Sequence, residues 1–105
     1  LKEGIECEYI NQIATRIYKD SGYFEFVRHR IGHGMGFEGH EAPWLSPGDK
    51  TELKKNMIFS NEPGIYRPNI DGYRTISSMI VDTNKGRQIS KFLDKSIDNR
   101  IINLN

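Results

Sequence analysis

The stretch GHGMGFEGHEAPW, residues 32–44, carries two histidines, two glutamates and four glycines. Three kinds of local structure are compatible with it: a nucleotide-binding loop, a metal centre, or a glycine-rich turn that holds histidine for packing reasons. Glycine tolerates positive φ and close backbone approach, so such a stretch can reverse direction sharply. A second stretch, NEPGIY at residues 61–66, places a glutamate directly before Pro-Gly and raises a related question.

The nucleotide interpretation rests on the spacing Gly34-x-Gly36-x-x-Gly39, which matches the dinucleotide-binding fingerprint. That fingerprint has to open a helix whose N-terminus meets a pyrophosphate group. Here Pro43 and the turn-forming cluster at residues 46–49 predict a loop instead of a helix. The context therefore excludes a nucleotide-binding loop.

The metal interpretation rests on His33 and His40, which are seven residues apart and so are not a helical zinc-binding pair of spacing four. Seven residues of extended chain span about 23 Å, so both rings reach one site only if the glycines fold the chain back. A lone histidine in such a loop is more often a surface or hydrogen-bonding residue than a ligand. These residues alone leave both interpretations open.

The rest of the pattern predicts one helix followed by several antiparallel strands, an α+β fold class. The helix is expected over about residues 4–21, with its apolar face at Tyr9, Ile13 and Ile17 and an adjoining strip at Ile10 and Ala14. Ser21-Gly22 is expected to end it. Strands are expected at residues 24–27, from Met57 to a break at Pro63-Gly64, at residues 73–82 and at residues 88–93.

The composition narrows the class of partner and the compartment. The chain has 105 residues, enough for one domain or part of one, and its 15 basic and 14 acidic residues are interspersed. That balance argues against nucleic acid or an anionic membrane as partner. No membrane span or secretory leader is expected. Cys7 is the only cysteine, so a reducing, cytoplasmic compartment is the simpler expectation, with Cys7 as a small apolar helix residue.

Three blocks taken together resemble the C-terminal catalytic half of the pita-bread metallopeptidases. The blocks are RIGHGMGFEGHEAPWL at residues 30–45, NMIFSNEPGIYRP at residues 56–68, and GYR at residues 72–74 before an apolar strand. This family contains the Xaa-Pro dipeptidases and aminopeptidase P, relatives of methionine aminopeptidase. Its catalytic unit holds two metal ions with two Asp, one His and two Glu. The resemblance covers most of the chain, from Ser21-Gly22 to Val81.

The resemblance implies roles for five residues of this chain. His33 matches the metal-ligating histidine, and Glu62 matches the first metal-ligating glutamate. His40 matches a histidine that contacts the scissile carbonyl or the tetrahedral intermediate, and His29 a further active-site histidine. Arg74 matches the arginine of the last motif and is expected to bind substrate with His40. The donor set suits manganese or cobalt, and also admits zinc or iron; the implied substrate is a peptide with proline at the second position.

Two features depart from the family pattern. The paired aspartate ligands lie, in the family, upstream of the helix that begins this chain, so residues 1–105 are expected to form the C-terminal part of a catalytic domain. The last glutamate ligand is replaced by Ile76. Asp71 and Asp82 are both too far along the chain to substitute for it without a change of register.

Two hypotheses follow. In the first, the complete protein is a metal-dependent Xaa-Pro peptidase, expected to be a homodimer, and this chain alone is inactive. In the second, the complete protein is a metal-free pita-bread module, either a creatinase-like amidinohydrolase or a non-catalytic protein-binding relative. Ile76 favours the second hypothesis, whereas His33, His40 and Glu62 favour the first.

Overall fold

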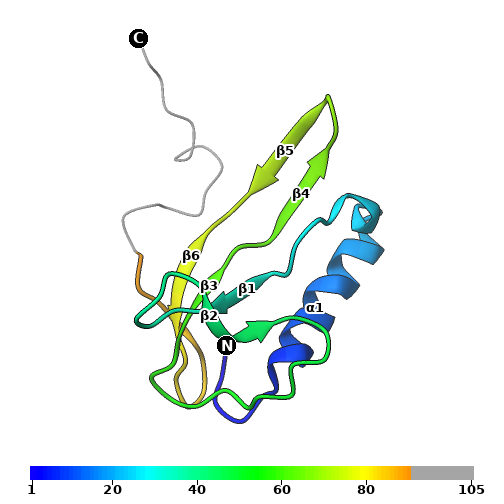
Figure 1. Cartoon of the computed structure of the whole chain (residues 1–105). Helices are drawn as coiled ribbons and strands as arrows, with labels where there is room; N and C mark the ends of the chain where they lie inside the picture. The colour runs from blue at the N-terminus through cyan, green and yellow to red at the C-terminus, as the bar shows by residue number, and fades with distance from the viewer. Residues whose placement is uncertain (91–105) are drawn as a thin grey trace.

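The computed structural model of the chain describes residues 1–90 and shows one helix packed on a five-stranded antiparallel sheet, from which a two-stranded hairpin extends (Figure 1). The elements are α1 (Cys7–Asp20), the 3-10 helix η1 (Phe24–Phe26), β1 (Gly32–Gly34), β2 (Glu41–Leu45), β3 (Ile58–Asn61), β4 (Gly64–Arg67), β5 (Asp71–Arg74), β6 (Ser77–Ile80) and β7 (Arg87–Gln88). The sheet order is β2-β1-β3-β6-β7, and β4 pairs with β5. The expected α+β class is confirmed.

Backbone hydrogen bonds satisfy polar groups at both ends of helix α1. The Cys7 N–H donates to the Thr51 carbonyl at 2.9 Å, which replaces a side-chain cap at the first turn. At the other end Gly22 has a φ of 80°, and the Tyr23 N–H donates to the Tyr18 carbonyl at 3.0 Å. The helix therefore lies inside the expected range and stops at the glycine, as predicted.

The apolar core lies between α1 and the sheet. Its buried members are Cys7, Ile31, Leu45, Leu53, Phe59 and Val81. From α1, Ile10, Ala14 and Tyr18 pack against this core. Their spacing of four residues follows one face of the helix.

The face of α1 expected to be buried lies one strip away from the face that packs on the sheet. Tyr9, Ile13 and Ile17 are 49%, 40% and 63% exposed, respectively. Successive helical residues point about 100° apart, so a shift of one position carries a side chain from the core toward solvent. The expectation for this strip was wrong within the described residues, while the adjoining strip at Ile10 and Ala14 is buried against the core.

The predicted strand at residues 24–27 is instead the 3-10 helix η1. The Phe26 N–H donates to the Tyr23 carbonyl, and the Val27 N–H donates to the Phe24 carbonyl. These hydrogen bonds between residues three apart use backbone N–H groups that, in a strand, would donate to a neighbouring strand. The alternating pattern of the sequence was therefore misread.

The loop predicted around Pro43 is also wrong, because Pro43 lies in β2. This strand is at the edge of the sheet and pairs with a neighbour on one side only. An edge strand tolerates proline, because the backbone N–H that proline lacks is not needed for a hydrogen bond within the sheet. The turn expected at residues 46–49 does follow it, and Gly48 there has a φ of 86°.

The later strands follow the expectations only in part. The strand expected from Met57 is β3, and it ends before Pro63-Gly64 as predicted. The strand expected at residues 73–82 is divided at Thr75 and Ile76 into β5 and β6, because the chain there passes from the hairpin into the larger sheet (Figure 1). Of the strand expected at residues 88–93, only residue 88 lies in a strand, β7, and residues 89–90 do not. Residues 91–93 lie outside the described residues.

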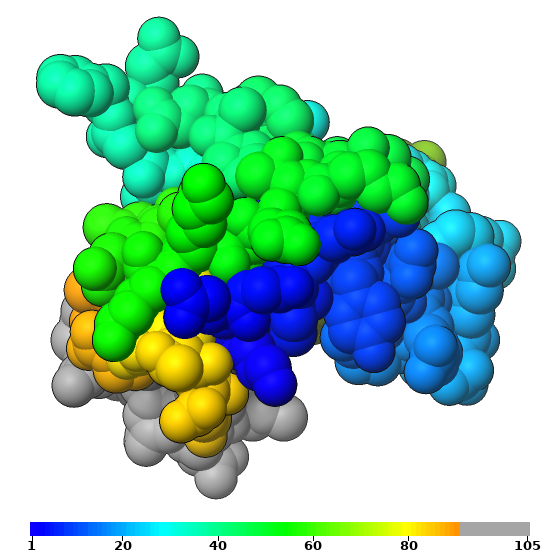
Figure 2. All heavy atoms as spheres, turned by 90° about the horizontal axis from the view of Figure 1, so that it is seen from below, coloured from blue at the N-terminus to red at the C-terminus, as the bar shows by residue number. Residues whose placement is uncertain are grey.

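The residues that precede α1 lie between two other segments of the chain. The Glu3 N–H donates to the Asp82 carbonyl at 3.1 Å, and the Leu53 N–H donates to the Ile5 carbonyl at 2.8 Å. Figure 2 shows these blue residues between the green segment and the yellow one. They fix the start of α1 against the sheet. Among residues 1–90, no helix combines the length and the apolarity needed to cross a bilayer.

Candidate metal centre

His33 is the middle residue of β1, which itself lies between β2 and β3. The register places it opposite Trp44 on one neighbour and opposite Ser60 on the other. The residue is 5% exposed, so the surrounding strands fix its position. A histidine buried at the centre of a sheet needs partners for its ring nitrogens.

The two glycines that flank His33 let the neighbouring strands approach it closely. A Cβ placed on Gly32 would lie 2.1 Å from the Ser60 carbonyl oxygen, and one on Gly34 would lie 2.8 Å from the Ala42 carbonyl oxygen. Neither distance is compatible with a side chain. The expectation that glycine allows the backbone to crowd the site is confirmed at these two positions.

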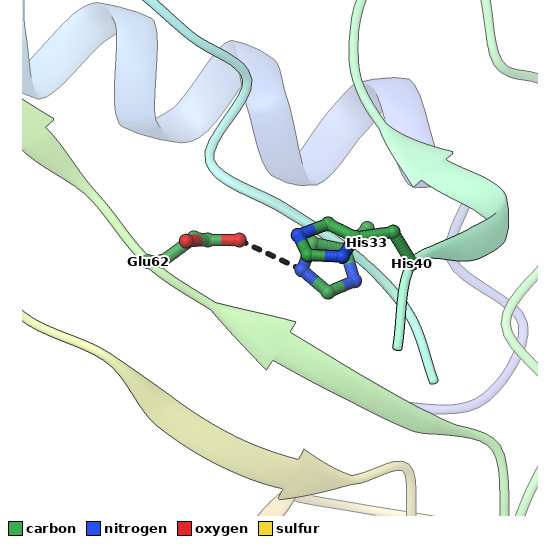
Figure 3. A group of neighbouring side chains, drawn as sticks. All are labelled: His33, His40 and Glu62. Atoms are coloured by element: carbon green, nitrogen blue, oxygen red, sulfur yellow. Dashed lines mark ion pairs between the residues drawn. The ribbon is translucent and has the colours of Figure 1, made fainter. Parts of the chain in front are cut away.

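The His33 ring contacts Glu62, which follows β3 directly (Figure 3). The Nδ1–H donates to the Gly34 carbonyl at 2.9 Å, and Nε2 lies 2.8 Å from Glu62 Oε1. Because a carbonyl oxygen only accepts, the proton of a neutral ring sits on Nδ1, and the Nε2 lone pair then faces a carboxylate oxygen. Two acceptors this close require a proton or a cation between them. The contact also confirms that the two side chains lie within metal-bridging reach.

His40 joins this pair from the loop between β1 and β2. Its ring stacks on the His33 ring, with 4.0 Å between the centroids and 30° between the planes. One ligand atom each from His33, His40 and Glu62 lie within 4.8 Å of one another. Figure 3 shows Glu62 directed toward the two stacked rings. The chain therefore does fold back at the glycines, as the metal interpretation required.

These three residues fit a divalent cation. Two imidazole nitrogens and one carboxylate oxygen form a donor set that manganese, cobalt, iron and zinc all accept. The orientation of His33 supports this, since Nδ1 lies against the Gly34 carbonyl and Nε2 is directed toward Glu62 Oε1. Within the described part of the chain, no other acid joins this group of three.

The two acids considered as substitutes for the missing glutamate have other partners. Asp71 pairs with Arg67 across the end of the β4–β5 hairpin. Asp82 pairs with Arg87 at 3.2 Å and also accepts from the Thr83 N–H. Both carboxylates are therefore held away from the group of three, in agreement with the sequence argument.

His29 lies in the segment between η1 and β1 and is not a member of that group. Its Nδ1–H donates to the Arg30 carbonyl at 2.7 Å, which leaves Nε2 to accept from the Tyr66 hydroxyl at 2.7 Å. Both ring nitrogens thus have protein partners. The hydrogen bond to Tyr66 fixes the ring orientation.

Arg74 and Ile76 lie where β5 ends and the chain continues toward β6. Arg74 is the last residue of β5, pairs with Gly64 and is exposed. Ile76 is 51% exposed and lies in the short break between β5 and β6. The register of the neighbouring strands thus places Ile76 beside Glu62, which follows β3.

Sequence reasoning missed two aromatic residues of this region. Trp44 is 6.5 Å from the His33 ring between centroids and also lies under the Arg30 guanidinium. Tyr66 holds His29. Both lie in the quoted blocks, but their contacts depend on strand register, which the sequence does not specify.

Cys7 behaves as the sequence suggested. It is fully buried, and that burial, together with the nearby Asp49 charge, raises the pKa of its thiol to about 11. The thiol is therefore protonated at neutral pH and is not a nucleophile.

Residues 1–83 match metallopeptidase family M24. The chain belongs to this family. It is 38% identical over 90 residues to the Xaa-Pro dipeptidase of Pyrococcus horikoshii, covering 86% of this chain and 26% of that protein. The resemblance to a pita-bread metallopeptidase is thereby confirmed.

Solved structures agree with the family assignment. The prolidase of Pyrococcus horikoshii OT3 superposes with a TM-score of 0.82 at 38% identity, over 86% of this chain and 26% of that one. The X-Pro aminopeptidase of Thermotoga maritima superposes with a TM-score of 0.83 at 30% identity, over 87% of this chain and 26% of that one. The described part is thus a partial pita-bread fold, and the chain spans about a quarter of the length of these relatives.

Proposed function

We propose that the complete protein is a metal-dependent hydrolase of Xaa-Pro dipeptides, and that this chain supplies part of its catalytic centre. The observation that carries the proposal is the contact between His33 Nε2 and Glu62 Oε1, with His40 stacked beside it. Membership of family M24 and similarity to Xaa-Pro dipeptidases support the substrate class.

In this proposal His33 and Glu62 hold the metal. A divalent cation held there would lower the pKa of a water and polarise the scissile carbonyl. Glu62, whose side chain is 16% exposed, would accept and return a proton beside it. His40 is exposed and lies against His33, so its ring is placed to stabilise the oxyanion that forms on the carbonyl.

The remaining roles come from the family pattern. Arg74 is proposed to bind substrate together with His40, and His29, held by Tyr66, to form part of the active-site wall. The remaining metal ligands, including the two aspartates, are proposed to lie in the rest of the complete protein. Manganese or cobalt is the proposed metal, with zinc or iron as substitutes. We further propose a cytoplasmic homodimer.

A second function is favoured by one residue. Ile76 cannot bind metal, and it occupies the position of the last ligand. A metal-free pita-bread module, either a creatinase-like amidinohydrolase or a protein-binding relative, would need no ligand there. The convergence of His33, His40 and Glu62 is the argument against it, because together they form a donor set that suits a divalent cation.

The test uses the complete protein with manganese and measures free proline released from an Xaa-Pro dipeptide. We expect metal-dependent hydrolysis, and a loss of about a hundredfold or more in the His33→Ala variant. Lys54→Ala, an exposed residue distant in sequence from the ligands, is the control and should leave the rate unchanged. Hydrolysis of creatine without metal would support the amidinohydrolase. Absence of metal binding and of both activities would leave the protein-binding module.

A further inference from the structure

A groove of about 870 Å³ runs beside α1, bounded by the segment at residues 27–30 and by the turn at Ser46-Pro47. Sites for small molecules are commonly about 300–1,000 Å³, so this groove is large enough for a ligand. None of the three residues of the candidate metal centre lines it. The groove is therefore a candidate ligand-binding site separate from the candidate metal centre.

The groove concentrates positive charge. Its lining contains four basic side chains and two acidic ones, namely Arg16, Lys19, Arg28 and Arg30, and Glu8 and Asp20. The whole chain has a net charge of only +1, so this excess is local. A concave surface with an excess of one sign of charge raises the local concentration of the opposite ion.

The basic side chains of the groove are free to meet an anion. Within residues 1–90, none of the four forms an ion pair with a carboxylate. One of the two acids is already occupied, because Glu8 pairs with Lys50 and accepts from the Gly48 N–H at 3.0 Å. The positive charge is thus less neutralised than the composition of the lining suggests.

Three of the basic groups are also held in place. The Arg30 guanidinium lies 4.0 Å from the Trp44 ring centroid, and the Lys19 ammonium 4.9 Å from that of Phe24. Arg28 Nη1 donates to the Val27 carbonyl at 3.2 Å. A guanidinium stacked on a ring keeps its in-plane N–H groups available, and a fixed donor loses little entropy on binding.

The remaining lining suits an organic ligand rather than a bare ion. Its neutral hydrogen-bonding residues are Asn11, Gln12, Thr15 and Ser46. Its apolar residues are Phe24, Val27 and Pro47. Such a mixture contacts both the charged groups and the carbon skeleton of a small molecule.

We propose that this groove binds a small polyanion whose phosphate or carboxylate oxygens are contacted by Arg16, Arg28 and Arg30. The shared chemistry is two or more oxyanion groups on one compact molecule, because charge-assisted bonds to three guanidinium groups need several acceptors. His29, proposed above as part of the active-site wall, also lines the groove. The inference does not depend on the proposed peptidase activity, since the anion is contacted by neither the metal nor its ligands.

The experiment is calorimetric titration of the metal-free 105-residue chain with citrate and, separately, with pyrophosphate, in a low-salt buffer. The groove variant is Arg16→Gln/Arg28→Gln. The matched control is Lys54→Gln/Lys85→Gln, which removes the same charge from two lysines outside the groove lining. We expect saturable binding that weakens at least tenfold in the groove variant and less than twofold in the control.

The two probes separate the sources of the anion. Tighter binding of citrate assigns the groove to a polycarboxylate, and tighter binding of pyrophosphate assigns it to a phosphorylated ligand. No saturable binding of either probe, or equal weakening in both double variants, would overturn the proposal. If the loss of Arg28 unfolds the chain, Arg16→Gln against Lys54→Gln decides instead, because Arg16 is exposed and its loss should still weaken binding severalfold.

Discussion

Glu62 and Ile76 lie opposite each other on the two strands that run from the sheet into the hairpin. On one side of them β3 pairs with β6, and on the other β4 pairs with β5. The two paired regions are separated by two residues on each strand. Because the two gaps are equal, the pairing register of β3 with β6 continues into that of β4 with β5. The Thr75 N–H donates to the Pro63 carbonyl there, at 3.2 Å. Opposed residues of antiparallel strands have Cβ atoms about 4.5–5.5 Å apart.

This geometry makes position 76 the decisive test of metal binding. In the complete protein, Ile76→Glu should tighten manganese binding about tenfold, because it adds a carboxylate opposite Glu62. The measurement is calorimetric titration with manganese, together with the melting temperature. Ile89→Glu is the control, since Ile89 has a similar exposed fraction, 48%, and follows β7.

The opposite result is equally informative. Without a cation, two carboxylates facing each other raise the pKa of one of them and destabilise the fold at neutral pH. An Ile76→Glu variant with no manganese binding and a lowered melting temperature would therefore support the metal-free module.

The glycines beside His33 should be intolerant of any side chain. Gly32→Ala should lower the free energy of unfolding by about 1–3 kcal/mol, because its Cβ would overlap the Ser60 carbonyl. Gly39→Ala is the matched control: a Cβ there meets no atom within 4 Å, and the change should stay within about 0.5 kcal/mol. Urea denaturation of the 105-residue chain measures both. Equal effects at the two positions would contradict the close approach of the strands.

The 105-residue chain alone should not hydrolyse Xaa-Pro dipeptides. Three donor residues converge in its described part, which is too few for a catalytic pair of metal ions. The assay measures proline release with manganese or cobalt, with the complete protein as positive control. Metal-dependent turnover by the purified chain would show that its own residues suffice.

The exposed strip of α1, formed by Tyr9, Ile13 and Ile17, should make the isolated chain self-associate. We expect a dimer by light scattering, since two-fold contacts are the commonest solution. Ile17→Lys should shift the chain toward monomer. Ile70→Lys, at a residue 72% exposed beyond β4, is the control and should not. A clean monomer of the unmodified chain at high concentration would rule this out.

The sequence predicted the convergence of His33, His40 and Glu62 better than it predicted the strands. His33, His40 and Glu62 lie in blocks whose order and spacing are specific, and glycine spacing indicated where the chain could fold back. The limits of α1 were also predictable, because Gly22 ends it by a local backbone requirement.

The errors arose where distant parts of the chain decide the local structure. Residues 24–27 are an exception, since they alternate like a strand but local hydrogen bonds to Tyr23 and Phe24 close them into a 3-10 helix. Pro43 is compatible with β2 only because that strand is at the sheet edge, and edge position is not written in the local sequence. The buried strip of α1 likewise depends on how the helix is rotated over the sheet.

The single cysteine gives the molecule a built-in reporter. Cys7 is fully buried at the start of α1, and its thiol is protonated at neutral pH. A thiol-specific dye can therefore reach it only when the first turn of the helix separates from the sheet. Under conditions where reclosing is fast, the labelling rate measures the free energy of that opening at one known site. Each variant described above can thus be compared with the parent chain without introducing a new cysteine.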